Sequence, residues 1–221
     1  MPRDSSFRLD PDLVLKAYTL GYFPMARSRR AETIFWVLPQ MRGVLELNKA
    51  RAPRGLRKLL RSEPYEVSID QDFAAVIAGC AEATQKRDDT WINPEIEDAY
   101  LALHVMGRAH SVECRQDGKL VGGLYGVAIG GVFCGESMFS RAPNASKIAM
   151  LHLIARLKHN GFSVIDTQFW TPHLAQFGVC ETPNDVYQAR LSALIDAPAD
   201  FRAGPAYFDA MTVLQSITQT S

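Results

Sequence analysis

Two glycine-containing turns divide one stretch of the chain into three segments in which apolar residues alternate. Asp117-Gly118 and Gly130-Gly131 separate residues 110–116, 120–129 and 132–139. These dipeptides are typical of two-residue hairpin loops, because glycine and aspartate tolerate the positive φ that such loops need. The pattern therefore predicts a three-stranded antiparallel meander, and any fold for this chain has to accommodate it.

Helical and extended patterns surround the meander. An amphipathic helix over 145–159 and a strand over 162–168 follow it, then a short helix begins at Thr171-Pro172. Helix starts at Asp70 and at Asn93-Pro94 precede the meander. This order favours an α+β fold, mostly antiparallel sheet with flanking helices, and by fold-level analogy it is GNAT-like, an acyltransferase architecture.

The first part of the chain has a different charge from the rest. The whole chain of 221 residues carries 24 basic and 24 acidic side chains, but residues 1–63 hold 13 basic and 6 acidic ones. A helix from Asp10 to Gly21, strands over 34–38 and 43–47 and a basic helix over 53–61 are expected there. We predict a small basic N-terminal α/β domain over 1–63 and a GNAT-like catalytic domain over 64–221.

A dense run of basic residues closes the N-terminal segment. A solvated surface would account for it, but such clustering also suits contact with a polyphosphate backbone. The candidate contacts are Arg51, Arg54, Arg57, Lys58 and Arg61.

Several classes of protein are excluded by composition. The four cysteines form no CxxC pair and the histidines have no ligand spacing, so we expect no metal, and the cysteines are interpreted as buried free thiols. The N-terminus has no apolar signal region, and no run of 18 apolar residues occurs. We therefore expect a cytoplasmic protein that does not enter a membrane.

The loop before the 145–159 helix is informative by what it lacks. GNAT enzymes usually bind the pyrophosphate of acetyl-CoA there through a glycine-rich loop whose N–H groups approach the phosphate. This chain has Arg141-Ala-Pro-Asn144-Ala-Ser146, in which Asn and Ser replace the glycines. We infer an acyl donor other than CoA, and no cofactor.

Three polar residues stand out in apolar strand sequences. Glu136 lies near the end of the third meander strand, while Asp166 and Gln168 share one face of the following strand at period 2. A solvent-facing strand end would explain Glu136, but a carboxylate in such surroundings is costly unless it is paired or functional. We expect Asp166 and Gln168 to project together at the mouth of a site.

Six motifs, in the same order and without large gaps from about Pro11 to Tyr187, closely resemble the leucyl/phenylalanyl-tRNA–protein transferase family. The motifs are GYFPMA, TWIN, LVGGLYGV, GESMFS, NASK and IDTQFW. The resemblance implies transfer of Leu or Phe, and also Met, from aminoacyl-tRNA to acceptor proteins with an N-terminal Arg or Lys, which marks them for degradation. It also implies a GNAT-like domain that uses neither acetyl-CoA nor a metal.

The resemblance also implies roles for individual residues. Asp166 and Gln168 match the catalytic pair, and Glu136 matches a carboxylate that binds substrate. Tyr18, Trp91 and Tyr100 match aromatic positions near the aminoacyl end of the tRNA, and Trp36 is a candidate for stacking on the terminal adenosine, although all four would suit core packing. Ser140, Asn144 and Ser146 are further substrate-binding candidates, although the last two are common helix caps. The expected pocket for the Leu or Phe side chain is formed by Leu124, Phe133, Met138, Leu153 and Ile165.

The chemistry requires no covalent intermediate, because an aminoacyl ester is already activated. We expect Asp166, oriented with Gln168, to deprotonate the incoming amine, while Glu136 anchors the α-ammonium of the donor. Either carboxylate could instead bind the cationic side chain of the acceptor. Two other functions stay open, an ordinary N-acetyltransferase and a noncatalytic tRNA-binding module.

Overall fold

The computed structural model describes residues 9–83 and 88–218, and it is built around one seven-stranded sheet. The sheet has the spatial order β4 (Glu66–Ile69), β5 (Ala109–Gln116), β6 (Lys119–Ile129), β7 (Val132–Ser140), β8 (Val164–Gln168), β3 (Met41–Glu46) and β9 (Cys180–Pro183). All neighbours run antiparallel except β7 and β8. The expected meander is confirmed as β5, β6 and β7, and Asp117, Gly118 and Gly130 have positive φ at its turns.

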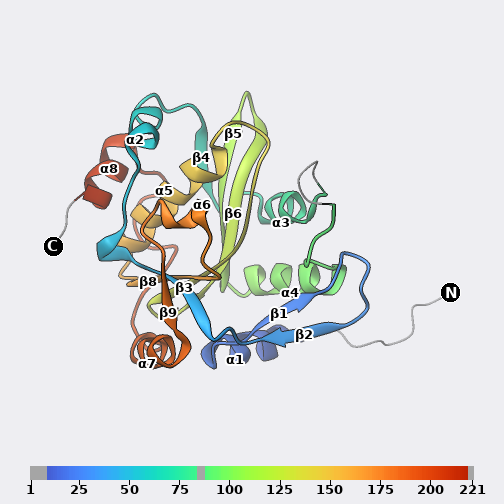
Figure 1. The fold of residues 1–221 in the computed structure, drawn as a ribbon. Helices are drawn as coiled ribbons and strands as arrows, with labels where there is room; N and C mark the ends of the chain where they lie inside the picture. The colour runs from blue at the N-terminus through green and yellow to red at the C-terminus, as the bar shows by residue number, and fades with distance from the viewer. Residues whose placement is uncertain (1–8, 84–87, 219–221) are drawn as a thin grey trace.

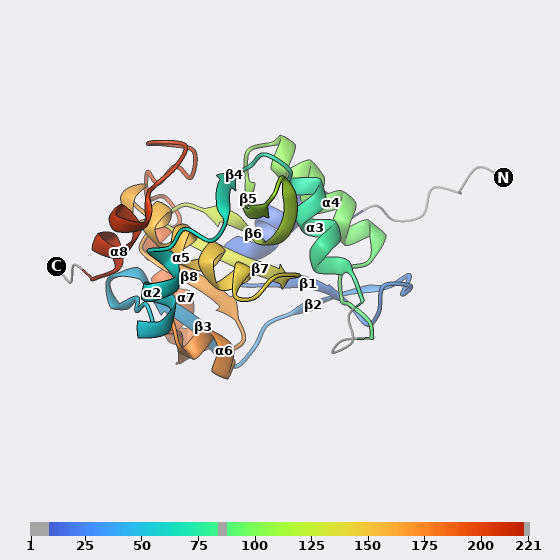
Figure 2. The same cartoon turned by 90° about the horizontal axis from the view of Figure 1, so that it is seen from above.

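Helices cover both faces of this sheet (Figures 1 and 2). On one face lie α2 (Arg54–Leu60), α5 (Ala145–His159), α6 (Pro172–Ala175) and α8 (Ala210–Thr218), and on the other α1 (Pro11–Thr19), α3 (Phe73–Ala81), α4 (Pro94–Val105) and α7 (Asn184–Leu194). A 3₁₀ turn, η1 (Leu47–Lys49), follows β3. The mixed α+β class with a mostly antiparallel sheet is confirmed.

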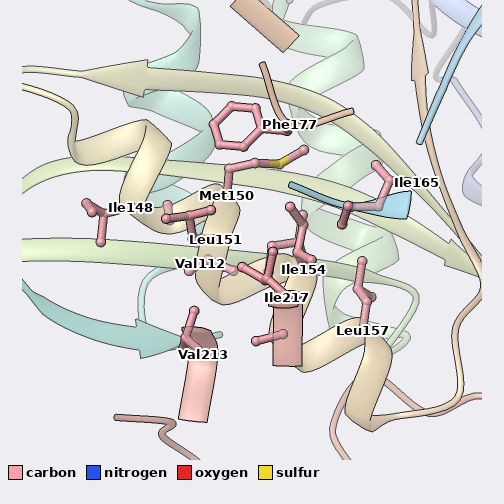
Figure 3. Packing of buried hydrophobic residues seen from close by; sticks show 14 of the residues in the cluster. Val112, Ile148, Met150, Leu151, Ile154, Leu157, Ile165, Phe177, Val213 and Ile217 are labelled. Carbon is pink, nitrogen blue, oxygen red and sulfur yellow. The ribbon is translucent and has the colours of Figure 1, made fainter. Parts of the chain in front are cut away.

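The long helix α5 is the centre of one core. Twelve of its fifteen residues are buried, because β5, β6, α2 and α8 all pack on it. Figure 3 shows Met150 and Leu151 of α5 between Phe177 on one side and Val213 of α8 on the other. A helix enclosed on nearly all sides holds its side chains in fixed positions, which suits a residue that shapes a binding site.

The helix starts follow the capping pattern with one correction. Asp10, Asn93 and Thr171 cap α1, α4 and α6 through their side chains. The expected cap Asp70 is wrong, because Asp72 caps α3 instead. The Asp70 carboxylate accepts hydrogen bonds from His110, Arg202 and the Ser111 N–H.

The strand over 43–47, which was expected within the N-terminal segment, pairs with strands from the later part of the chain. Observed as β3, it lies between β8 and β9 in the main sheet. Its apolar residues Val44 and Leu45 are buried on opposite faces of that sheet, which a short strand of a small domain would not allow. The division of the chain at residue 63 stays a prediction.

Three elements were not expected from the pattern. They are β1 (Phe23–Ala26), which forms a separate two-stranded sheet with β2 (Ile34–Val37), the edge strand β9, and α8 in the weakly patterned tail. Each is short, and β9 and α8 pack on β3 and α5, which are distant in sequence. The cysteines are free as expected, although Cys180 is exposed.

Candidate active site

The site lies where the two parallel strands of the sheet separate. β7 and β8 pair at three positions, and the last pair is Cys134 with Asp166. Glu136 and Gln168, each two residues further along, therefore face each other across the opening. The ladder between β6 and β7 also shifts here, passing from Gly126–Gly135 to Tyr125–Ser137. Glu136 is the extra residue of this bulge, which turns its side chain out of the regular alternation.

A cavity of about 270 Å³ opens at this fork. Its apolar wall comes from β6, β7, β8, α5 and α6, and its polar wall includes Glu136. The lining residues are Leu124, Tyr125, Gly135, Glu136, Ser137, Met138, Met150, Leu153, Ile165, Thr167, Thr171, His173 and Leu174. A cavity that is mostly apolar with a few polar groups on one side is typical of small-ligand sites.

The Glu136 carboxylate is surrounded by neutral donors. Gln168 Nε2 donates to Glu136 Oε1 at 3.1 Å, and the Tyr100 hydroxyl donates to Oε2 at 3.0 Å. The Tyr18 hydroxyl lies 2.5 Å from that of Tyr100. Burial raises the pKa of Glu136 to about 7, although the two tyrosine hydroxyls partly oppose the shift. Glu136 is therefore able to exchange a proton near neutral pH.

The Asp166 carboxylate is sealed from solvent and fully occupied. Arg42 contacts it in a fork, with Nε at 2.8 Å from Oδ1 and Nη2 at 2.5 Å from Oδ2. The Tyr187 hydroxyl and the Gln168 backbone N–H also donate to it, at 2.8 and 2.9 Å. Both Asp166 and Arg42 have no exposed surface. The expectation that Asp166 projects at the mouth of the site is wrong, because its side chain points to Arg42 and α7.

Most of the expected side-chain pocket lines the cavity. Leu124, Met138, Leu153 and Ile165 are all on its wall. Phe133 is not, because its ring is completely buried behind the wall and stacks on Phe201 at 5.5 Å. The bulge at Glu136 puts both side chains on the same face of the sheet, but Phe133 is paired with Ile165 before β7 and β8 separate and therefore lies in the core.

The aromatic candidates divide into two groups. Tyr18 and Tyr100 contact each other beside Glu136, as described above. Trp36 is 37% exposed on β2, and the Trp91 carbonyl accepts the Ala26 N–H while its ring packs on the core under β1. Neither tryptophan lines the cavity.

The candidates at the start of α5 also lie outside the cavity. The Ser140 hydroxyl accepts the Ser146 N–H at 3.0 Å, so Ser140 takes the part expected of a cap at Asn144 or Ser146. Asn144 has a φ of 63° and makes no side-chain cap. With Ser146 N–H already bonded, this helix start has one donor fewer for an anion.

The five basic candidates lie on and beside α2. Leu56 and Leu60 face the core, so the charged residues of this helix project outward. Within the described part of the chain, Arg51, Arg54, Arg57, Lys58 and Arg61 have no acidic partner within 4.0 Å. The Arg51 N–H donates to the Phe177 carbonyl at 2.8 Å, which ties the start of this basic segment to the end of α6 at the cavity.

The sequence did not indicate several residues of the site. Arg42, Met150, His173 and Tyr187 are not among the candidates that the sequence suggested. Burial and the nearby Lys147 lower the pKa of His173, which lines the cavity opposite the sheet. The Thr171-Pro172 helix start, which points His173 at the fork, was the signal that could have identified it.

The described residues offer neither a metal site nor a membrane span. No group of three or more His, Cys, Asp or Glu side chains in residues 9–83 and 88–218 is arranged to hold an ion. In the same residues, no helix has the length and apolar character that crossing a bilayer requires.

The fold and the cavity define the class of protein: an α+β enzyme whose site combines an apolar chamber with one titratable carboxylate. The family model for leucyl/phenylalanyl-tRNA protein transferase matches residues 44–192, and the model for its N-terminal domain matches residues 7–40. The chain belongs to the leucyl/phenylalanyl-tRNA protein transferase family.

Individual relatives agree with this assignment. A leucyl/phenylalanyl-tRNA–protein transferase of Dinoroseobacter shibae is 52% identical over 198 residues, covering 90% of this chain and 87% of the relative. One of Ruegeria pomeroyi is 49% identical, covering 96% of this chain and 99% of the relative. Among solved structures, that of L-PGS from Bacillus licheniformis has a TM-score of 0.45 and 12% identity, covering 71% of this chain and 65% of that one.

Proposed function

We propose that this chain transfers Leu or Phe, and also Met, from aminoacyl-tRNA to proteins whose N-terminal residue is Arg or Lys, and thereby marks them for degradation. Family membership supports the donor and the protein acceptor. The observation that carries the chemistry is Glu136, a carboxylate poised to titrate near neutral pH on the wall of an apolar cavity.

The apolar chamber is the proposed seat of the transferred side chain. The side chains of Leu, Phe and Met are unbranched at the β-carbon, whereas the β-branched Ile and Val are widest near the backbone. Met138 and Met150 on the wall adapt to several shapes because the thioether chain is unbranched. Discrimination by contact alone is modest, about 1 to 3 kcal/mol per methylene, so we expect preference rather than absolute choice.

The proposed reaction is direct aminolysis of the ester. The acceptor amine nitrogen forms a bond with the ester carbonyl carbon, and the bond from that carbon to the ribose oxygen breaks. Glu136 takes a proton from the amine and returns one to the departing oxygen. Positioning of two reactants is worth roughly 7 to 11 kcal/mol of barrier, and a general base adds about 10²- to 10⁴-fold.

This proposal moves the role of general base, first expected of Asp166, to Glu136. A general base must have an oxygen lone pair that can reach the reacting amine. Glu136 lines the cavity and Asp166 does not, so Glu136 meets this requirement. Asp166 instead holds the Gln168 N–H, so that the Gln168 side chain reaches Glu136. The Tyr18 and Tyr100 hydroxyls are proposed to stabilise the ionised form of Glu136.

The basic segment from Arg51 to Arg61 is proposed to bind the tRNA backbone. Its unpaired cations and its link to α6 would bring the phosphates of the acceptor end towards the cavity. Such contacts predict affinity that falls steeply with salt. We also propose that the sheet from β5 to β8 with α5 is GNAT-like, because α5 follows a meander and precedes a parallel strand at the fork.

The direct test uses radiolabelled Leu-tRNA and peptides that differ only in the first residue. We expect label on peptides that begin with Arg or Lys, little on one that begins with Gly, and much slower labelling by Glu136→Gln. Label transferred from acetyl-CoA instead would support an N-acetyltransferase. Binding of the tRNA without any transfer would support a noncatalytic tRNA-binding module, and either result would overturn the proposal.

A further inference from the structure

Arg42 is the largest side chain that is completely buried next to the site. Its guanidinium lies between the rings of Phe23 and Tyr187, at 5.1 and 4.6 Å from their centroids, and Nη1 donates to the Gly21 carbonyl at 2.7 Å. The other two nitrogens contact Asp166, as described above. Arg42 is not part of the cavity wall, so a substrate in the cavity would not touch it.

Residues 167–169 follow Asp166 directly, and their backbone conformation is unfavourable. Gln168 has a φ of 55°, and the Phe169 N–H donates to the Thr167 carbonyl at 2.6 Å, closing a three-residue turn around Gln168. A turn of this kind with positive φ at its centre is rare and strained for a residue other than glycine. It persists only where the surroundings fix it.

The surroundings that fix this turn come from β3 and α7. Asp166 Oδ1 accepts the Gln168 N–H at the same time as Arg42 Nε, and Tyr187 holds the other oxygen. Gly43, the next residue after Arg42, leaves space for the turn. A Cβ on Gly43 would lie 2.6 Å from the carbonyl carbon and oxygen of Phe169.

We propose that Arg42 is a positioning residue for the transfer reaction, which acts through Asp166 to hold the Gln168 turn and so aims the Gln168 amide at Glu136. The inference rests on the proposed function of the site. It assigns Asp166 the part of a fixed anchor whose charge Arg42 neutralises, and it makes the buried pair a requirement for catalysis rather than for folding alone. Buried ion pairs are poor stabilisers compared with apolar packing, which is consistent with a functional reason for this one.

The test compares Arg42→Lys and Arg42→Met with Arg190→Met. Lys keeps the charge but loses the two-pronged contact. Arg190 is the control, because it forms a different ion pair with the same neighbourhood of the sheet, from α7 to Glu46 Oε1 of β3 at 3.0 Å, and does not contact Asp166. For each variant we would measure the thermal midpoint, then kcat and the KM for Leu-tRNA at a temperature where all are folded.

A positioning role predicts that kcat falls while KM stays within about twofold. We expect roughly a tenfold loss in kcat for Arg42→Lys and about 10²-fold for Arg42→Met, the effect of a misplacement on the order of 1 Å. Arg190→Met should keep the wild-type kcat. If Arg42→Lys kept the wild-type kcat, or if kcat fell equally in Arg190→Met, the inference would be wrong.

A second variant tests the proposal if an Arg42 variant does not fold. Tyr187→Phe keeps the ring beside Arg42 and removes only the hydroxyl that binds Asp166. It should lower kcat by several-fold with the same unchanged KM, and a wild-type kcat would contradict the proposal. The wild-type rate tests the proposed function separately, because a wild type that transfers nothing would contradict that function and not the comparison among variants.

Discussion

The two strands at the fork carry carboxylates that look alike in sequence and behave differently in the structure. On β7, Glu136 sits at a bulge, lines the cavity and receives hydrogen bonds from neutral groups. On β8, Asp166 does not line the cavity and is paired with a guanidinium. The same functional group is thus a titratable acid on one strand and half of a buried ion pair on the other.

The difference teaches that a carboxylate takes its role from the donors around it. Neutral hydroxyls and an amide leave the Glu136 carboxyl able to gain a proton, and burial raises its pKa to about 7. The guanidinium beside Asp166 instead contacts both of its oxygens, and four donors occupy its lone pairs. The predictions below test whether these two environments assign the two roles.

The largest expected effect is on the rate of transfer by Glu136→Gln. The amide keeps the shape and the contact with the Tyr100 hydroxyl but cannot accept a proton from the amine. We expect the single-turnover rate to fall about 10²- to 10⁴-fold, with stability unchanged or slightly raised. Rapid-quench measurement of Leu transfer would show it, and a loss of less than fivefold would mean that Glu136 is not the base.

Removal of the Asp166 carboxylate should mainly lower the stability of the fold. Asp166→Ala leaves Arg42 buried without its counter-ion, which costs about 3 to 5 kcal/mol of unfolding free energy. Denaturant unfolding followed by circular dichroism would measure the loss. Asp166→Ala combined with Arg42→Met removes the uncompensated charge and should recover much of the stability but not the activity. If the double variant recovered activity, the different roles assigned to Glu136 on β7 and Asp166 on β8 would be wrong.

The sequence predicted the frame of this site well, because the frame depends on local signals. The hairpin turns, the α5 pattern and the period-2 pair Asp166 and Gln168 are all visible in short windows. The fork was not visible, since it depends on where β7 and β8 cease to pair. The Arg42 contact was not visible either, because 124 residues separate it from Asp166. In a basic run of the sequence, nothing distinguishes an arginine that becomes buried from one that stays on the surface.

The bulge in β7 could not be predicted from the sequence pattern either. Phe133 and Met138 differ in parity, so regular alternation would place them on opposite faces of the sheet, whereas the resemblance implied one pocket. The shifted pairing with β6 puts both on one face, opposite Ala128 and Leu124, and their different places along β7 explain why Met138 lines the cavity while Phe133 packs behind it. Prediction of such positions needs the cross-strand partner, and the partner is a property of the fold.

A smaller effect is expected on the pH dependence of stability. The pKa of Glu136 is raised from 4.5 in the unfolded chain to about 7 in the folded one, so the folded state holds the extra proton between these values. Its contribution is therefore present below about pH 4.5 and is lost as the pH rises to about 7, by at most about 3 kcal/mol. Unfolding free energies of the wild type and Glu136→Gln, measured from pH 5 to 8, should differ in slope with this sign. Parallel curves would show that Glu136 titrates with an ordinary pKa.

The smallest expected effect is on the choice between Leu and Phe. Met138 follows Glu136 on β7 and lines the cavity, so Met138→Ala enlarges the chamber on the strand that we assign to substrate contact. A Leu side chain would fill the larger space less well than Phe, and the ratio of kcat/KM for Leu-tRNA to that for Phe-tRNA should fall by about tenfold. Phe133→Leu is the matched control on the same strand, because Phe133 packs on Phe201 behind the wall. It should lower the thermal midpoint and leave the Leu to Phe ratio within twofold, whereas an equal change in both variants would mean that Phe133 also shapes the cavity.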